Sequence, residues 1–407
     1  MASDALDYPI RRTRAYVDLD ALEHNLSVLA GRVPGSGLVP AVKADAYGHG
    51  VEAVAAVCES WGATMLAVAN LQEYLYLRDQ GITLPILILE DLFPEEIDTA
   101  LRAGARLSAG SVAYAERLAE RAAVLGTTAM LHVNVDTGMG RMGLFADDPV
   151  AEILRIAGLG STTFEGLFSH FPASDEADKA FALHQVEQVE RILAALERDG
   201  VTVRYRHIAN SGAIIDFPGR VSWDLVRPGV AMYGMFPSRD VDHGVDLRPV
   251  MRVESALVKV TRYNRPWTVG YGRTYPVSPG SVIGIVPIGY GDGYPRSLSG
   301  RGEVLVHGCR VPIAGRVSMD MIAVDLTGVP GDPVVGDDVV LLGRQGEGEI
   351  DAAELADLTG TITYEITCGF TPRVPRLYVR GGSVVAVKSV GQGYRAVQPG
   401  DPAPDSD

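Results

Sequence analysis

Short apolar runs alternate with amphipathic stretches from about residue 38 to about residue 233 of the chain. The runs suit buried strands, and the predicted strands are Val39–Lys43, Met65–Ala69, Ile86–Glu90, Arg106–Ser108, Leu131–Val135, Phe164–Phe168, Arg204–Ile208 and Ser222–Arg227. The predicted helices between them include Val51–Ser60, Pro94–Ala103, Ala113–Leu125, Pro149–Ala157 and Ala180–Arg198. Strands that alternate with helices indicate parallel βαβ units, and eight such units are typical of a (β/α)8 TIM-like barrel.

The pattern changes after about residue 246, where short alternating strands are separated by Gly, Pro and Asp turns. The predicted strands here are Glu254–Thr261, Ser281–Pro287, Glu303–Val306, Met321–Asp325 and Asp338–Leu342. We therefore predict an α/β chain with a barrel over 14–245, a mainly β C-terminal domain over 246–388, an N-terminal extension over 1–13 and a disordered tail over 389–407. A further strand, Ala15–Asp20, is expected to associate with the β domain.

Composition narrows the class of protein. The chain has 407 residues, 47% of them hydrophobic and 21% charged, which indicates two globular domains. The net charge of -15 argues against binding to nucleic acid or to anionic membranes. The first residues lack the apolar region of a signal peptide, and no apolar run approaches a membrane span of about 20 residues. We expect a cytoplasmic protein with reduced cysteines and no metal site.

Polar groups follow five of the eight predicted barrel strands. The segments that carry them contain Lys43, Arg141, His170, the group Asn210, Ser211 and Gly212, and the group Arg227, Pro228 and Gly229. A single strand-end lysine more often lies on the surface, but functional groups collect at the carboxyl ends of barrel strands. The segments after the seventh and eighth strands are where barrels bind phosphate through backbone N–H groups. A lysine beside a phosphate site suits pyridoxal 5'-phosphate bound covalently to that lysine.

Several motifs together resemble the pyridoxal-phosphate-dependent alanine racemases of the barrel-fold family, over about residues 14 to 380. The motifs are Ala41–Gly50, Asp136–Gly143, His207–Ser211, Arg227–Gly234, Gly270–Tyr275, Gly289–Tyr294, Gly315–Asp320, Tyr364–Ile366 and Arg373–Arg376. The resemblance implies a homodimer with shared active sites that interconverts L- and D-alanine and supplies D-alanine for peptidoglycan. It also implies that Lys43 and Tyr271 act as bases on opposite faces of the substrate–cofactor adduct.

The resemblance implies the following further site residues. The cofactor would be bound by Lys43, Tyr47, His170, Asn210, Ser211, Arg227, Gly229, Val230 and Tyr364. Within that set, Arg227 would donate to the pyridine nitrogen, and His170 would lie against the ring and support Tyr271. The substrate would meet Arg141, Met319, Tyr290 and Asp320. Residues that match the family's access corridor are Asp175, His207, Arg296 and Arg316.

One position departs from the family pattern. Many alanine racemases have a carbamylated lysine seven residues before the arginine of the Thr-Gly-Met-Gly-Arg motif, and that position here is Asn134. An amide cannot form a carbamate, so a negative charge near Arg141 is missing. Two hypotheses stay open: a bound anion such as chloride replaces the charge, or Asn134 hydrogen-bonds Arg141 without any ion.

Other functions fit the residues less well. A broad-specificity or serine racemase would share this mechanism and differ in pocket size. A decarboxylase of the same barrel would carry a carboxylate where Arg227 stands, and a non-catalytic cofactor-binding barrel would lack the β domain. The run Gly138–Gly143 matches a dinucleotide motif, but its glycines do not open a helix directly.

Overall fold

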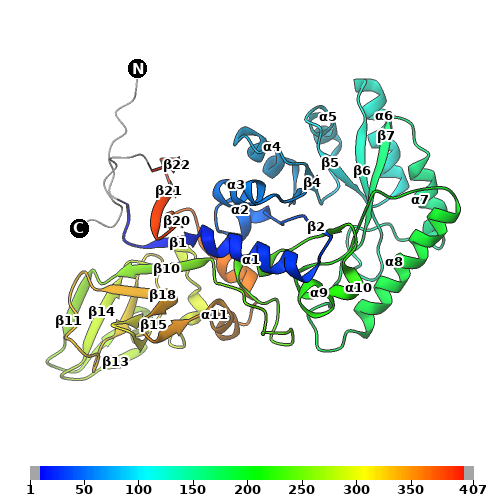
Figure 1. Cartoon of the computed structure of the whole chain (residues 1–407). Coiled ribbons are helices and arrows are strands. Elements are labelled where there is room, and N and C mark those ends of the chain that lie inside the picture. Colours follow the sequence, from blue (N-terminus) through cyan, green and yellow to red (C-terminus); the bar gives the residue numbers. More distant parts are fainter. Residues whose placement is uncertain (1–9, 398–407) are drawn as a thin grey trace, which may run out of the picture. The chain divides into compact units, whose positions relative to one another are not determined.

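The computed structural model describes residues 10–397 and separates into two compact units. The barrel unit comprises 22–46 and 54–248, and the β unit comprises the described residues up to Ala21, Tyr47–Ala53 and the chain from Pro249 onward. The predicted boundary near residue 246 lies close to this division, although two earlier segments belong to the β unit. Figure 1 shows the elements of both units.

The barrel unit contains a parallel sheet in the order β3-β4-β5-β6-β7-β8 and a parallel pair, β2 and β9. The strands are β2 (Gly37–Leu38), β3 (Leu66–Val68), β4 (Ile86–Ile88), β5 (Arg106–Ala109), β6 (Ala129–Asn134), β7 (Thr162–Phe168), β8 (Tyr205–His207) and β9 (Leu225–Val226). A bridge between Ala41 and Ala67 joins the β2 segment to β3, and the Arg227 amide donates to the Ala209 carbonyl beside β8. The predicted (β/α)8 barrel followed by a mainly β region is confirmed.

Helices connect the barrel strands, and capping residues fix where several of them begin. Asn70, Ser111 and Asp148 each accept a hydrogen bond from an amide of the first helical turn, which satisfies a donor that the helix itself cannot. Helices α6 and α7 pack against β6 and β7 (Figure 1). The helices are α1 (Leu19–Arg32), α3 (Val51–Trp61), α4 (Leu71–Asp79), α5 (Pro94–Arg102), α6 (Val112–Leu125), α7 (Pro149–Ala157), α8 (Ala180–Arg198), α9 (Ser211–Asp216), α10 (Pro218–Val221) and the 3-10 turn η1 (Val230–Tyr233).

The first predicted strand, Val39–Lys43, was wrong in its bounds, because the observed strand ends before the predicted one begins. Strand β2 covers Gly37–Leu38, and Lys43 instead begins α2 (Lys43–Tyr47), in which the four residues after Lys43 have φ of 53° or 54°. This is a left-handed turn, a backbone conformation that is energetically unfavourable for residues other than glycine. Such a turn prevents the extended segment, which forms a bridge at Ala41, from continuing as a strand beyond Lys43.

The β unit has a nine-stranded sheet in the order β16-β15-β18-β10-β1-β20-β21-β22, with β19 paired to β18. Strand β1 (Arg14–Asp18) pairs antiparallel with β10 and parallel with β20. The other strands are β10 (Met251–Ala256), β11 (Lys259–Arg262), β12 (Trp267–Val269), β13 (Tyr275–Val277), β14 (Val282–Val286), β15 (Glu303–Val306), β16 (Cys309–Pro312), β17 (Ile322–Asp325), β18 (Asp338–Gln345), β19 (Gly348–Ile350), β20 (Arg376–Arg380), β21 (Ser383–Ser389) and β22 (Gly393–Ala396). Short helical elements are η2 (Tyr271–Arg273), η3 (Tyr290–Asp292), η4 (Arg296–Leu298), α11 (Ala352–Thr359) and α12 (Thr363–Gly369).

Two predictions for the β unit need correction. The expected strand Glu254–Thr261 is divided between β10 and β11, because the Leu257 amide bonds Asp337 while the next amide, of Val258, bonds Ile285 in a different sheet. The predicted disordered tail over 389–407 contains strand β22, which pairs with β21. Packing of Tyr394 against Tyr378, with ring centroids 5.6 Å apart, accounts for that order. The rest of the tail, 398–407, lies outside the described residues, and no helix among those described has the length and hydropathy to cross a membrane.

Candidate active site

Lys43 lies half-buried at the end of the first barrel strand. The Glu73 carboxylate holds the adjoining backbone, since it accepts hydrogen bonds of 2.7 Å from the amides of Ala44 and Ala69. Burial lowers the pKa of the Lys43 amine, and the positive charge of Arg141 lowers it further. A lower pKa leaves more of the amine uncharged near neutral pH, which is the state that attacks a carbonyl or accepts a proton.

Arg227, directly after β9, is a buried cation without an adjacent carboxylate. Only 7% of the residue is exposed. Its guanidinium donates to Nδ1 of His207 at 2.7 Å and to the Ser169 carbonyl at 2.8 Å, and it lies 5.2 Å from the ring centroid of Phe168. Burial, followed by the charge of Arg141, lowers the pKa of Arg227 to about 9, so the group stays protonated at neutral pH.

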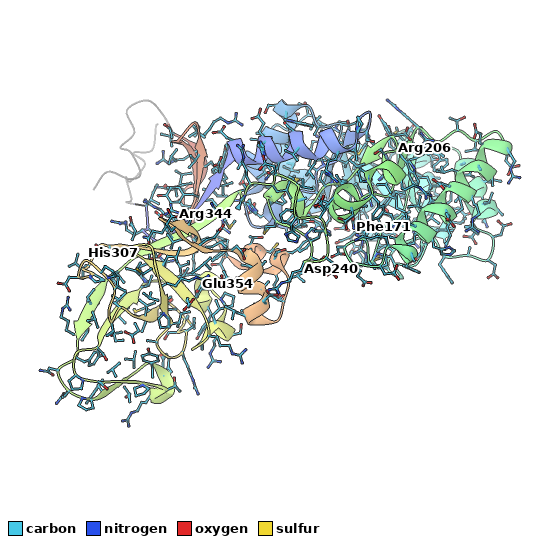
Figure 2. The ribbon with its side chains drawn as sticks, turned by 60° about the horizontal axis from the view of Figure 1, so that its bottom comes forward. Phe171, Arg206, Asp240, His307, Arg344 and Glu354 are labelled. Atoms are coloured by element: carbon cyan, nitrogen blue, oxygen red, sulfur yellow. The ribbon has the colours of Figure 1, made fainter. Side chains whose placement is uncertain are left out.

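His170 follows β7 and accepts a hydrogen bond from Arg227 through Nδ1, at 3.2 Å. A guanidinium can only donate, so the ring proton of neutral His170 is on Nε2. Burial and then the charge of Arg227 lower the pKa of His170 to about 3, which keeps it neutral. The next residue, Phe171, which is labelled in Figure 2, packs edge-on against Phe217 with ring centroids 5.8 Å apart, and this packing anchors the segment.

The segments after β8 and β9 form a cluster of backbone donors. The Ser211 hydroxyl accepts hydrogen bonds from the amides of Gly229, at 2.9 Å, and Ala231, at 3.2 Å. Asn210 caps α9 by accepting from the Ala213 amide at 3.2 Å, and Val230 begins η1. The structure thus brings together the four residues that the sequence analysis assigned to this corner, and backbone amides of this kind suit an anion.

The Arg141 loop lies after β6, and the Asp136 carboxylate shapes it. This carboxylate accepts from the amides of Gly138, at 2.8 Å, and Arg141, at 3.2 Å. The Arg141 side chain is exposed, yet its charge lowers the pKa of both Lys43 and His170. Arg141 therefore adds positive potential where a carboxylate or phosphate would be attracted.

His207, which the resemblance assigns to the access corridor, is enclosed by other side chains. The residue is fully buried, and its ring bonds Arg227 on one side and His132 on the other. This burial does not favour a place in the access corridor, and the corridor assignment of His207 stays a prediction. Asp175, by contrast, is partly exposed and lies close to Gly212, where an added Cβ would be 3.3 Å from the Asp175 Cβ.

Tyr271 opens the turn η2 of the β unit, and the residue is 70% exposed. Glycines with positive φ flank it, with φ of 76° at Gly270 and 73° at Gly272. The Arg316 guanidinium lies against this turn, since a Cβ added at Gly272 would be 3.2 Å from Arg316 Cζ. These glycines let the chain project a phenol outward from a tight turn.

Tyr290 and Met319 lie on two loops of the β unit that are bonded to each other. The Tyr290 amide donates to the Ser318 carbonyl at 3.0 Å, and the Gly291 amide donates to the Met319 carbonyl at 2.8 Å. Both side chains are exposed. Arg296, which begins η4 a few residues later, is also exposed.

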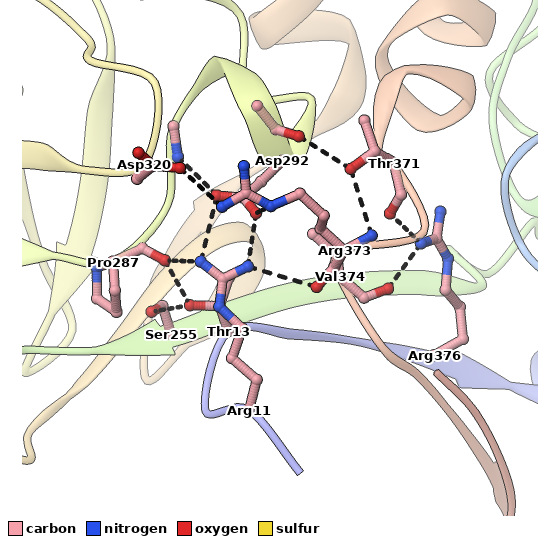
Figure 3. Close-up of polar contacts among 12 residues, drawn as sticks. Arg11, Thr13, Ser255, Pro287, Asp292, Asp320, Thr371, Arg373, Val374 and Arg376 are labelled. Carbon is pink, nitrogen blue, oxygen red and sulfur yellow. Dashed lines mark hydrogen bonds and ion pairs between the residues drawn. The ribbon is translucent and has the colours of Figure 1, made fainter. Parts of the chain in front are cut away.

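A buried carboxylate supports these loops. Asp292 is fully buried, caps its own turn by accepting from the Gly289 amide at 3.0 Å, and pairs with Arg11 and Arg373 (Figure 3). Arg373 also donates to Asp320 at 2.8 Å. Arg373 therefore ties the η3 turn, through Asp292, to Asp320 of the neighbouring loop.

Tyr47 and Tyr364 lie together in the β unit, with ring centroids 5.9 Å apart. Burial raises the pKa of the Tyr47 phenol above its usual value, so it remains a hydroxyl that can donate. Glu73 and Asp292 were not singled out from the sequence. Glu73 does stand at a helix-capping spacing from Asn70, whereas nothing in the sequence distinguishes Asp292 from a surface residue.

Comparison with known proteins identifies matches over nearly the whole chain. Residues 17–237 match the family model of the alanine racemase N-terminal domain, and residues 250–378 match that of the C-terminal domain. An alanine racemase from Desulfosudis oleivorans is 40% identical over 91% of this chain and 97% of its own. The structure of an alanine racemase from Clostridium difficile has a TM-score of 0.88 at 34% identity, and covers 93% of this chain and 98% of its own. A histidine racemase from Leuconostoc mesenteroides has a TM-score of 0.83 at 28% identity, over 92% and 99%.

Proposed function

The chain belongs to the alanine racemase family, and we propose that it interconverts L-alanine and D-alanine with pyridoxal 5'-phosphate as cofactor. The observation that carries this proposal is the buried cation Arg227, which has no carboxylate ion pair among residues 10–397. A fixed cation that cannot accept a proton suits a ring nitrogen that must stay unprotonated. Such a ring limits competing reactions of an amino acid.

The residues of the barrel unit fit this cofactor. The amine of Lys43 has a lowered pKa, as a covalent attachment to an aldehyde requires. The Ser211 hydroxyl and the Val230 amide would hold the phosphate, with Gly229 fixing that segment by donating to Ser211 and Asn210 fixing it through its cap. Tyr47 and Tyr364, which belong to the β unit, are assigned to the same phosphate by the resemblance to the alanine racemases. When bound, the cofactor supplies an electron-withdrawing system that acidifies the α-hydrogen of the substrate.

Racemisation needs one group that removes a proton and another that returns it on the opposite face. We assign these roles to Nζ of Lys43 and the phenol oxygen of Tyr271. The neutral His170 has its proton on Nε2, so it would stabilise Tyr271 by donating to it.

The substrate carboxylate would be bound by Arg141 and the Met319 amide, with Tyr290 and Asp320 beside it. The ion pair between Arg373 and Asp320 supports this assignment, because it holds the Met319 loop in place. Asp175, Arg296 and Arg316 would lie along the access corridor; none of the three is buried.

We further propose a cytoplasmic homodimer in which Tyr271 and Tyr290 reach the partner's site, and a role in supplying D-alanine for peptidoglycan. Exposed apolar side chains support an interface on the β unit, including Met319, Met321 and Ile362, all more than half exposed. Sedimentation equilibrium of the full chain with cofactor tests the dimer. A monomer at micromolar concentration would remove this part of the proposal.

A broad-specificity racemase is the second candidate, and two observations favour it. Asn134 departs from the family pattern at a position near Arg141, and a histidine racemase shares the fold over most of its length. Measuring the turnover of several amino acids decides between the two candidates.

The test is chiral product analysis of the purified, cofactor-loaded protein with L- and D-alanine, serine, histidine and larger amino acids. Conversion confined mainly to alanine is expected, whereas comparable turnover of several substrates would establish the broad-specificity reading. Lys43→Ala should abolish turnover and the absorbance of the lysine-bound cofactor, while the exposed Lys259→Ala control should leave both unchanged. Full activity of Lys43→Ala would refute the site assignment.

A further inference from the structure

A continuous hydrogen-bonded chain of buried side chains extends behind Arg227. Arg227 donates to His207 at 2.7 Å, the rings of His207 and His132 are joined at 2.9 Å, and Nε2 of His132 lies 3.3 Å from Oε2 of Glu165. The two histidines are fully buried, and Glu165 is 3% exposed. These residues come from β6, β7, β8 and the end of β9. We call them the Glu165 relay.

The position of each proton in the relay follows from the donors available. Arginine can only donate, so Nδ1 of His207 accepts and its proton is on Nε2. That Nε2–H points at Nδ1 of His132, which must accept, so the proton of His132 is also on Nε2. This last proton points at the Glu165 carboxylate. Every donor in the relay therefore points away from Arg227 and toward Glu165.

Two local features of β7 make the relay possible. The pairing of β6 with β7 shifts register between Leu131 and His132, so Glu165 is an extra residue, and a bulge of this kind redirects a side chain. Gly166 then leaves room for the imidazole, since a Cβ there would be 2.4 Å from Nδ1 of His132. Without that gap the His132 ring could not reach His207.

The surroundings keep the relay in one protonation state. His207 stacks on Phe168 with centroids 4.9 Å apart, and His132 stacks on Tyr205 at 6.0 Å. Burial lowers the pKa of both histidines, and for His207 the charge of Arg227 adds to the effect. Burial by itself would raise the pKa of Glu165, but hydrogen bonding from His132 and the charge of Arg106 reverse this and hold it below its usual value.

Charged groups face the relay at both ends. Arg106, at the start of β5, lies 3.3 Å from Glu165, and Arg204 lies 3.8 Å from it. At the other end stands Arg227, whose desolvated charge has only neutral acceptors around it. The nearest anion along its hydrogen bonds is Glu165.

We propose that Glu165 is a positioning residue for Arg227: through His132 and His207 it fixes an acceptor toward the guanidinium and compensates its charge from the far end of the relay. The inference rests on the proposed function, in which Arg227 donates to the cofactor ring. If the tautomer of His207 reversed, Nδ1–H would face the Arg227 donor, and the guanidinium would lose its closest partner.

The first test measures the tautomers directly and needs no activity. The full chain, without and with pyridoxal 5'-phosphate, is labelled with 15N-imidazole histidine, and long-range proton–nitrogen correlation reports each ring. His132 and His207 are both expected as neutral Nε2–H rings from about pH 6 to about pH 8. A protonated ring, or an Nδ1–H ring at either position, overturns the relay. A racemase-inactive protein with both expected tautomers would refute only the proposed function.

The second test uses two variants, one that removes the charge of Glu165 and one that displaces the His132 ring. Glu165→Gln keeps an acceptor for His132 but loses the charge, and Gly166→Ala keeps the charge but pushes the His132 ring away. Each is expected to lower kcat roughly tenfold with little change in KM, as the loss of one charge-assisted hydrogen bond would. Gly166→Ala should also change the His207 tautomer.

Asp98→Asn is the matched control. It removes the ion pair between Asp98 and Arg121, 2.7 Å long, on the helices of the same unit, and should change neither kcat nor the tautomers. If Glu165→Gln and Gly166→Ala both retain wild-type kcat while the wild-type protein racemises alanine, Glu165 has no positioning role. If Glu165→Gln does not fold, Gly166→Ala and the tautomers of the wild-type protein still decide the question.

Discussion

The barrel unit and the β unit each bury a charged side chain, and they satisfy it in opposite ways. Asp292 in the β unit is enclosed by two oppositely charged partners, Arg11 and Arg373. Arg227 in the barrel unit has neutral acceptors around it, and its anion lies two imidazoles away. A direct ion pair holds a loop in place, whereas a cation without a direct counterion keeps its charge available to a ligand. This difference indicates that Asp292 has a structural role in the β unit and that Arg227 has a chemical role in the barrel unit.

The largest effect on stability and activity is expected from the substitution of Arg227. Arg227→Met removes the cation and leaves the acceptors at His207, Ser169 and His170, the first two of them fully buried, without their donor. Each unsatisfied buried group costs about 1–3 kcal/mol, so the free energy of unfolding should fall by about 3 kcal/mol or more, and racemisation should be lost. Urea denaturation followed by circular dichroism measures the first effect. A fully stable variant would show that the acceptors have other partners.

A smaller effect is expected at the β-unit charge. Asp292→Asn keeps an acceptor for the Gly289 amide but leaves Arg11 and Arg373 without their anion. Both arginines are partly exposed and can turn toward water, so the loss should be about 1–2 kcal/mol. Because the Tyr290 and Met319 loops lose their support, KM should rise more than kcat falls. Steady-state kinetics with alanine check this, and a fall in kcat alone would contradict the supporting role.

Acidification should act on the barrel unit through its neutral histidines. The folded-state pKa of His170 is about 3, below the unfolded value of about 6.5. The contribution of neutral His170 to the free energy of unfolding is therefore fully present above about pH 6.5. It is lost as the pH falls toward 3, by up to about 1.4 kcal/mol for each pH unit. Unfolding of His170→Gln should depend less on pH in this window, and the exposed His184→Gln should behave like the wild type. Identical pH slopes for all three proteins would contradict the low pKa.

The smallest expected effect concerns Asn134. If an anion binds beside Asn134 and Arg141, chloride in place of acetate should raise the melting temperature slightly. The free energy of unfolding should rise by less than about 1 kcal/mol. Among the hydrogen bonds of residues 10–397, none joins the side chains of Asn134 and Arg141, and both hypotheses for Asn134 stay open. Asn134→Leu should remove the chloride effect. A crystal structure in chloride with no density at this position would refute the hypothesis.

Much of the fold could be predicted because hydrophobic patterns repeat with the period of the element they form. The strands of the barrel and helices such as Pro149–Ala157 follow from local spacing and capping residues. The strand-end residues Lys43, Arg141, His170 and Arg227 could be grouped because parallel strands end at one edge of a barrel. The grouping of these residues, though not their roles, could therefore be predicted from the chain alone.

Other features depended on contacts between distant residues. The left-handed turn after Lys43, the division of one predicted strand into β10 and β11, and the order of β22 are set by partners far along the chain. His207 was assigned to the access corridor from a sequence motif, and a motif carries no information about the side chains that surround a residue in the fold. Its burial between His132 and Arg227 follows from a bulge at Glu165 and a gap at Gly166.

The sequence by itself determined which elements form and which reactive groups stand at the strand ends, because short-range periodicity and chain order fix both. Only the tertiary structure decided how each charge is compensated. Whether Arg227 meets a carboxylate or an imidazole, and whether Asp292 lies in water or between two arginines, depends on residues that the chain separates by 20 to 281 positions. Burial removes water as a partner, so the surrounding side chains then determine what each charge can do.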